Sequence, residues 1–198
     1  MKKITRNIEF FYDYVSPYSY LANHKIASFA NFKIIYRPIL LGAVMQATNN
    51  KPPSFIPEKG RYIMKDIQRW AKHYQIPLKM NSIFPQNTLN ALRLAIVCQH
   101  EDCFELVHQS LFDAMFINNK NLSKLKVLSE IIHQHSLDLE YFMSKIMEDS
   151  IKDELKRNTD DAISRGVFGA PTFFIEDEMF FGNDRLHLLE EVIRKELL

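Results

Sequence analysis

Strand-like and helix-like patterns alternate at the start of the chain. Residues 8–15 are rich in aromatic and β-branched side chains, which predicts a strand. Apolar residues at helical spacing follow over residues 17–29, and residues 32–39 again have the composition of a strand. Because parallel strands need a crossover connection such as a helix, this β-α-β order favours a parallel pair.

The middle of the chain is different, because its pattern is almost entirely helical from residue 57 to about residue 166. A loop rich in Asn and Pro over residues 49–54 precedes it. Asp102 and Ser123 are predicted helix caps, since Asp and Ser favour the N-cap position. The predicted helices lie near residues 58–74, 88–100, 102–116, 123–135, 139–147 and 150–165.

Strand character returns near the end of the chain. Residues 172–175 and 179–181 are aromatic and flank a polar segment, which predicts a hairpin. A last helix is then predicted, with Asn183 or Asp184 as its cap and apolar positions through Leu197.

The order of these elements, β-α-β, many helices and then β-β-α, predicts an α/β fold with a large all-helical insertion. Residues 1–45 and 166–198 are predicted to form one domain, and residues 46–165 the inserted helical domain.

Composition narrows the class of protein. The 198 residues are 46% hydrophobic, and the 25 basic residues nearly balance the 24 acidic ones, so a nucleic-acid partner is not expected. The apolar run after the basic start is broken by Glu9 and Asp13, which predicts neither a signal peptide nor a membrane span and favours the cytoplasm. Cys98 and Cys103 do not form a Cys-x-x-Cys motif and are interpreted as two reduced helix cysteines.

Histidines suggest no metal site, because none of the seven has metal-ligand spacing. His73, His108, His133 and His135 are expected on helix surfaces.

Candidate chemistry begins at the turn before the first helix. Ser16 precedes Pro17, and proline is favoured in the first helical turn, which makes Ser16 a strong candidate N-cap. The free backbone N–H groups of such a helix start can hold an anion. We expect Asp13, in a strand that is predicted to be buried, to hold this turn rather than contact a ligand.

A second candidate site lies at Ala170-Pro171, where glycines and small residues permit an unusual backbone before a strand. Cis peptide bonds are nearly confined to proline, so the sequence permits one here without establishing it. A cis turn would expose the N–H and C=O of Ala170, and an extended peptide ligand could pair with them.

The element order and the proline before the third strand resemble the thioredoxin fold. Ser16-Pro17-Tyr18-Ser19 stands where a thioredoxin has Cys-x-x-Cys, so disulfide exchange at this position is not available.

Five segments further resemble the family of 2-hydroxychromene-2-carboxylate isomerases and kappa-class glutathione transferases, which have a DsbA-like thioredoxin fold. Ser-Tyr-Leu-Ala at residues 19–22 is closer to the isomerases, whereas residues 50–53 and 59–60 are closer to the kappa pattern. The five segments are residues 11–22, 50–53, 57–62, 168–172 and 181–186.

This resemblance implies glutathione as the cofactor. Ser16 would stabilise its thiolate rather than act as a nucleophile, since no histidine is placed by a motif to deprotonate it. The backbone of Ala170 before Pro171 would pair with the cysteinyl part. The γ-glutamyl end would bind Asn183 and Asp184, and Phe181 and Gly182 of the same segment are assigned to glutathione binding as well. Lys59 and Asn50 would contact the glycine carboxylate or the nearby backbone.

The resemblance implies a glutathione-dependent cis-trans isomerase that converts 2-hydroxychromene-2-carboxylate to trans-o-hydroxybenzylidenepyruvate in aromatic degradation, by reversible thiolate addition. Two alternatives stay open: a kappa-like glutathione transferase or peroxidase, and a thiol-less DsbA-like peptide-binding protein. The resemblance also implies a homodimer.

Candidates for the substrate wall are Tyr18, Phe84 and Asn87. Trp70 is a further candidate, but core packing is at least as good an interpretation for Trp70 and Phe84. Arg93 is interpreted as an exposed helix arginine, with binding of a substrate carboxylate as the alternative.

Overall fold

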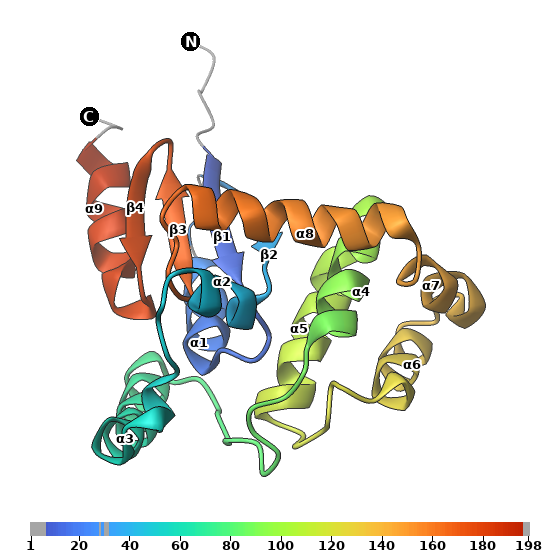
Figure 1. Ribbon diagram of the computed structural model, residues 1–198, viewed down its shortest axis with the longest axis horizontal. Helices are drawn as coiled ribbons and strands as arrows, with labels where there is room; N and C mark the ends of the chain where they lie inside the picture. Colours follow the sequence, from blue (N-terminus) through green and yellow to red (C-terminus); the bar gives the residue numbers. More distant parts are fainter. Residues whose placement is uncertain (1–6, 28, 30–31, 196–198) are drawn as a thin grey trace.

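A computed structural model of the protein describes residues 7–195 apart from residues 28, 30 and 31 (Figure 1). At its centre is a four-stranded mixed sheet with the order β2-β1-β3-β4. Strand β1 is parallel to β2 and antiparallel to β3, which pairs antiparallel with β4. The predicted parallel pair and the predicted hairpin are therefore confirmed. The strands are β1 (Asn7–Tyr12), β2 (Lys33–Pro38), β3 (Thr172–Ile175) and β4 (Glu178–Phe181).

Helices flank the sheet and fill the segment between β2 and β3. Figure 1 shows α9 beside β4, and α8 running from the sheet towards α7. The α-helices are α1 (Pro17–Ile26), α2 (Leu41–Ala47), α3 (Pro57–Tyr74), α4 (Leu89–His100), α5 (Phe104–Phe116), α6 (Leu125–Gln134), α7 (Leu139–Lys145), α8 (Asp149–Ser164) and α9 (Leu186–Lys195); the 3-10 turns are η1 (Pro53–Phe55) and η2 (Asn183–Arg185).

The first strand and the first helix are shorter than predicted. Strand β1 ends at Tyr12 because the Asp13 side chain accepts the Val15 N–H at 3.0 Å and its carbonyl accepts the Ser16 N–H at 3.0 Å, which together close a turn. Helix α1 ends at Ile26 rather than at residue 29, helix α2 was not predicted, and the predicted position Leu197 lies outside the described residues.

Both predicted caps of the helical segment are wrong. Asp102 has a left-handed backbone (φ +53°) and follows the end of α4 instead of capping α5. The Ser123 hydroxyl bonds to Asn121 Oδ1 at 2.7 Å, and α6 begins two residues later, at Leu125.

One hydrophobic core joins the sheet to the helical segment. Phe10 of β1 stacks on Phe173 of β3 with ring centroids 4.8 Å apart, and Tyr12 packs on Phe112 of α5 at 6.1 Å. The division into residues 1–45 with 166–198 and residues 46–165 stays a prediction, and both parts contribute to this core. Among the described residues no helix is long and apolar enough to cross a membrane.

His108 corrects the expectation of a surface histidine, because it is only 3% exposed. Its Nδ1 lies 2.8 Å from the Tyr14 hydroxyl and its Nε2 lies 2.9 Å from Asn23 Oδ1, while its ring stacks on Phe104. Burial lowers the pKa of His108 to about 3, so the imidazole is neutral at physiological pH.

Candidate active site

Ser16 caps α1, as predicted, and also contacts the loop before β3. Its Oγ accepts the Ser19 N–H at 3.1 Å and donates to the Ala170 carbonyl at 2.9 Å. The side chain is nearly buried, at 4% exposure, and Pro17 occupies the first helical position. The hydroxyl therefore joins the start of α1 to a segment more than 150 residues away in the sequence.

Asp13 holds the Ser16 turn, which confirms its predicted role. One carboxylate oxygen accepts the Val15 N–H at 3.0 Å and the Thr88 hydroxyl at 2.6 Å, and the other accepts the Leu41 N–H at 3.0 Å. Burial raises the pKa of Asp13 above its ordinary value, although these three donors act in the opposite direction. The carboxylate thus ties the turn to the beginnings of both α2 and α4.

The Ala170-Pro171 peptide bond is cis, as the sequence permits. The Pro171 carbonyl accepts the Gly182 N–H at 3.0 Å, so this loop is fixed against the end of β4. One expectation needs correction: the Ala170 carbonyl is not free at an edge, because it accepts the Ser16 hydroxyl.

Asn50 lies next to the same loop. Its Nδ2 donates to the Phe168 carbonyl at 2.8 Å, and Phe168 packs against Phe181 with ring centroids 4.5 Å apart. A Cβ on Gly169 would come within 2.7 Å of the Phe181 ring, so only glycine allows this close packing.

The turn after β4 presents Asn183 and Asp184. Asn183 is 2% exposed, and its Nδ2 has no hydrogen-bond partner among the described residues. Asp184 pairs with Arg185 and lies over Gly182, which has φ +100°. The prediction that Asn183 or Asp184 caps the last helix is wrong. Both lie in η2, whose N-cap is Gly182 without a side-chain capping bond, and α9 begins only at Leu186.

Helix α3 connects this turn with the start of α1. Tyr74 donates its hydroxyl to the Asn183 carbonyl at 2.9 Å, and Tyr18 donates to Asp66 Oδ2 at 2.8 Å. Burial and the bond to Asp66 raise the pKa of Tyr18, so its hydroxyl is a donor at neutral pH. Ser16, Ala170 and Asn183 are therefore held in one region by α1, α3 and η2.

Three assigned residues are not bonded to this region. In the part of the chain that the structure describes, no hydrogen bond, ion pair or ring contact joins Lys59 or Phe84 to Ser16, and both side chains are exposed. Asn87 is exposed and accepts the Leu89 N–H at 2.9 Å, which shapes the turn before α4. The core interpretation is wrong for Phe84, which is 43% exposed.

Arg93 and Trp70 are both half-buried. Trp70 packs against the main core, in line with the core interpretation. Arg93 is not the exposed helix arginine that was expected: its Nε is buried and has no partner among the described residues, and burial lowers its pKa. An arginine without a carboxylate partner is suited to bind an anion.

Sequence patterns missed the polar groups that hold the region together. Thr88, Asp66 and Tyr74 each make one bond of 2.6 to 2.9 Å to a residue of the Ser16 or Asn183 segments. No local motif marks them, since each partner is far away in the sequence. The only signal was that Thr88 stands just before an apolar helix, where a capping residue is common.

Fold and site together define a thioredoxin-like protein in which serines replace the thiols at the helix start. The family model of the DsbA-like thioredoxin domain matches residues 7–194. The chain belongs to this family, and within it to the group of 2-hydroxychromene-2-carboxylate isomerases and kappa-class glutathione transferases.

Individual relatives cover nearly the whole chain. A 2-hydroxychromene-2-carboxylate isomerase from Pseudomonas sp. (strain C18) is 34% identical over 94% of this chain and 89% of its own length. A second one, from Sphingobium xenophagum, is 30% identical over 96% of this chain and 99% of its own. The glutathione S-transferase kappa 1 of Rattus norvegicus is 29% identical over 93% of this chain and 89% of its own.

A solved structure agrees with these relatives. The structure of a 2-hydroxychromene-2-carboxylate isomerase superposes with a TM-score of 0.88, with 28% sequence identity and 96% coverage of both chains. A probable DsbA oxidoreductase from Streptomyces coelicolor superposes with a TM-score of 0.79 at 13% identity, which supports the fold alone.

Proposed function

We propose that the protein is a glutathione-dependent cis-trans isomerase that converts 2-hydroxychromene-2-carboxylate to trans-o-hydroxybenzylidenepyruvate. The observation that carries this proposal is the Ser16 hydroxyl, placed at the start of α1 against the carbonyl before a cis proline. Relatives named as isomerases of this type at 30 to 35% identity support the reaction class.

The residues present fit glutathione. Asn183 Nδ2 is buried without a partner, so it can bond a polar group of a ligand, and Asp184 next to it can receive the γ-glutamyl ammonium. The Tyr18 N–H, in the first turn of α1, has no acceptor among the described residues and can bond an anion. Phe181 and Gly182 shape the same edge of the site.

When bound, glutathione would supply a thiolate nucleophile for reversible addition to the ring-opened, conjugated substrate. Ser16 would donate its O–H to the sulfur, which would favour the charged form of the thiol. In doing so Ser16 releases the Ala170 carbonyl, and that carbonyl can accept the N–H of the cysteinyl part. Both the Ser16 hydroxyl and the Ala170 carbonyl would thereby keep a hydrogen-bond partner.

Ser16 has no base with which to act as a nucleophile. In the described chain its Oγ bonds only the Ser19 N–H and the Ala170 carbonyl. A serine nucleophile needs an adjacent general base, so we assign Ser16 the role of thiolate stabiliser.

Several assignments complete the proposal. Asn50 and Lys59 bind the glycine end of glutathione, and Tyr18, Phe84 and Asn87 line the substrate site. Arg93, whose Nε lacks a partner, binds the substrate carboxylate. We further propose that the protein is a cytoplasmic homodimer and acts in aromatic degradation.

The test uses calorimetric titration with glutathione and an isomerisation assay on the chromene, with and without glutathione. We expect binding, and conversion only when glutathione is present. Absence of glutathione binding would overturn the proposal. Conversion at the same rate without glutathione would overturn the assigned mechanism.

A kappa-like glutathione transferase or peroxidase is the second candidate, because the transferase relatives cover 93% of this chain as well. Conjugation of an aryl halide without activity on the chromene would select it. Binding of unfolded peptide, with Ser16→Ala silent in every enzyme assay, would select the thiol-less DsbA-like alternative.

A further inference from the structure

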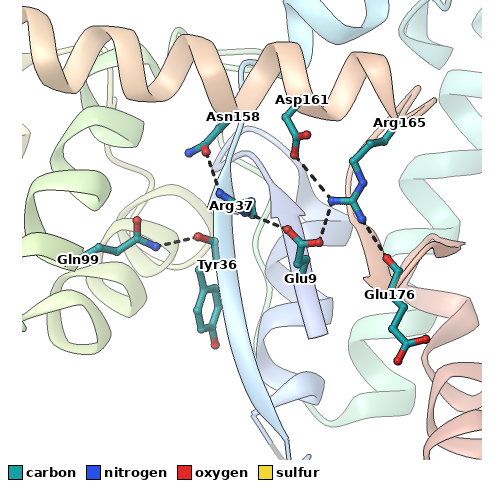
Figure 2. A network of polar contacts seen from close by, with 8 residues as sticks. All are labelled: Glu9, Tyr36, Arg37, Gln99, Asn158, Asp161, Arg165 and Glu176. Carbon is teal, nitrogen blue, oxygen red and sulfur yellow. Dashed lines mark hydrogen bonds and ion pairs between the residues drawn. The ribbon is translucent and has the colours of Figure 1, made fainter. Parts of the chain in front are cut away.

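An open groove lies along β2, on the edge of the sheet that is not paired with β1. Its volume is about 710 Å³, and residues of β2, α4, α5 and α8 line it. Figure 2 shows two polar contacts at this edge: Gln99 donates to the Tyr36 carbonyl at 2.9 Å, and Arg37 contacts Asn158 at 3.4 Å. Cys103 is among the residues that line the groove.

The end of α4 brings this cysteine to a second one. The Cys103 N–H bonds to the Cys98 carbonyl at 3.0 Å across Asp102, whose backbone is left-handed at φ +53°. This is a Schellman cap, in which the residue two beyond the helix end bonds back to the last turn. The side chains at these two positions frequently contact each other in such caps, and here both carry thiols.

The two thiols differ in access. Cys98 is fully buried at 0% exposure, whereas Cys103 is 8% exposed and faces the groove. Both cysteines are free thiols in this structure. A disulfide needs Cα atoms only a few ångströms apart, and the backbone hydrogen bond that closes this cap draws the two cysteines together.

We propose that Cys98 and Cys103 form a redox-active dithiol that low-molecular-weight disulfides such as glutathione disulfide oxidise through the β2 groove. This assignment is independent of the proposed isomerase activity, because it uses neither Ser16 nor the Ala170-Pro171 loop. The pair also lies outside the helix start at which thioredoxins place their thiols.

Oxidation takes place in two exchange steps. Cys103 Sγ attacks one sulfur of glutathione disulfide, so that its S–S bond breaks, glutathione thiolate leaves and a mixed disulfide forms on Cys103. Cys98 Sγ then attacks the Cys103 sulfur, releasing the second glutathione and closing the Cys98–Cys103 bond. The two thiol protons pass to the two leaving thiolates, so one glutathione disulfide is reduced to two glutathiones.

Burial raises the pKa of both thiols, which makes the thiolate scarce at neutral pH. We therefore expect the exchange to be slow at neutral pH. Its rate should rise about tenfold per pH unit below the pKa of the Cys103 thiol, in proportion to the thiolate fraction.

The test incubates the full-length protein with excess glutathione disulfide, blocks remaining thiols by alkylation after acid quenching, and measures the intact mass and the peptides. The expected product is a monomeric chain lighter by two hydrogens, with a Cys98–Cys103 peptide cross-link that dithiothreitol removes. Three results with the wild-type chain would overturn the proposal. They are two thiols that both remain open to alkylation, accumulation of the mixed disulfide, and formation of intermolecular disulfides alone.

Two matched variants test the order of attack. In Cys98→Ser the resolving thiol is missing, so the glutathione mixed disulfide on Cys103 should accumulate. In Cys103→Ser the remaining thiol is fully buried, so the chain should stay unmodified over the same time. Equal modification of both variants would contradict the assigned order.

Discussion

Replacing Ser16 by alanine removes the structural bonds of its hydroxyl together with its proposed role at the glutathione thiolate, and two measurements distinguish the two losses. In the structure Ser16 Oγ caps α1 through the Ser19 N–H and satisfies the Ala170 carbonyl. With glutathione bound, the same hydroxyl is proposed to stabilise the thiolate. Ser16→Ala should therefore lower stability and raise the pKa of the bound glutathione thiol.

The two effects are of similar size and are observed in different quantities, the free energy of unfolding and the pKa of the bound thiol. Loss of an N-cap side chain costs about 1 kcal/mol. The Ala170 carbonyl also loses its partner, but Ala170 is half-buried and water can replace the serine in part, so we expect a total of about 1 to 2 kcal/mol. A hydrogen bond to a charged group is worth about 1.5 to 3 kcal/mol, and exchange of the Ala170 carbonyl offsets part of it. The pKa of the bound thiol should thus rise by about one unit.

Denaturant unfolding measures the first effect, and titration of the thiolate absorbance of bound glutathione measures the second. Ser16→Thr is the matched control, because threonine keeps the hydroxyl and is also a favoured N-cap residue. Its bound thiol should titrate close to the wild-type pKa. An alanine variant that loses stability but leaves the thiol pKa unchanged would refute the role of Ser16 in thiolate stabilisation.

Three further perturbations test other parts of the structure. Burial lowers the pKa of His108 to about 3 in the folded protein, so below pH ~6.5 only the unfolded chain binds a proton there. The free energy of unfolding should therefore fall by about 1.4 kcal/mol per pH unit as the pH drops from ~6.5 towards 3. Denaturant unfolding of His108→Gln should show a flatter pH dependence. Thr88→Val keeps the shape but removes the 2.6 Å bond to Asp13, so the free energy of unfolding should drop by about 1 to 3 kcal/mol; an unchanged denaturation midpoint would contradict this tether. Gly182→Ala places a side chain at a residue with φ +100° and its Cβ 2.4 Å from Asp184 Oδ1, so calorimetry should show weaker glutathione binding. In the control variant Gly42→Ala the new Cβ has no atom within 4 Å, and glutathione should bind normally.

Much of the fold follows from local pattern, because the strands are short aromatic runs and the helices have clear apolar periodicity. The parallel pair, the hairpin and the helical segment were predicted for that reason. Errors came where side chains end an element: Asp13 ended β1 early, and Asp102 adopted a left-handed backbone instead of capping α5. The first outcome depends on a side-chain bond of Asp13 and the second on the backbone bond from the Cys103 N–H to the Cys98 carbonyl, and apolar periodicity predicts neither.

The candidate site divides in the same way. Ser16 and Ala170-Pro171 were predicted because proline restricts the backbone beside them. Asn183 is buried, and its amide nitrogen has no partner among the described residues. This depends on the packing of η2 against α3 through Tyr74, which no local sequence pattern indicates. His108 was misplaced because a histidine on an amphipathic helix can face either side, and only the tyrosine and asparagine facing it favour burial.

Asp13 explains how distant parts of the chain fix the turn that carries Ser16. A carboxylate at 3% exposure is costly unless donors surround it, and the donors come from the turn itself, from Leu41 and from Thr88. None of the three can move away without leaving a buried carboxylate short of a partner. The beginnings of α2 and α4 must therefore keep their positions relative to Ser16. A loss of stability in Thr88→Val should consequently be accompanied by a change at the proposed thiolate site, although Thr88 makes no contact with Ser16 among the described hydrogen bonds.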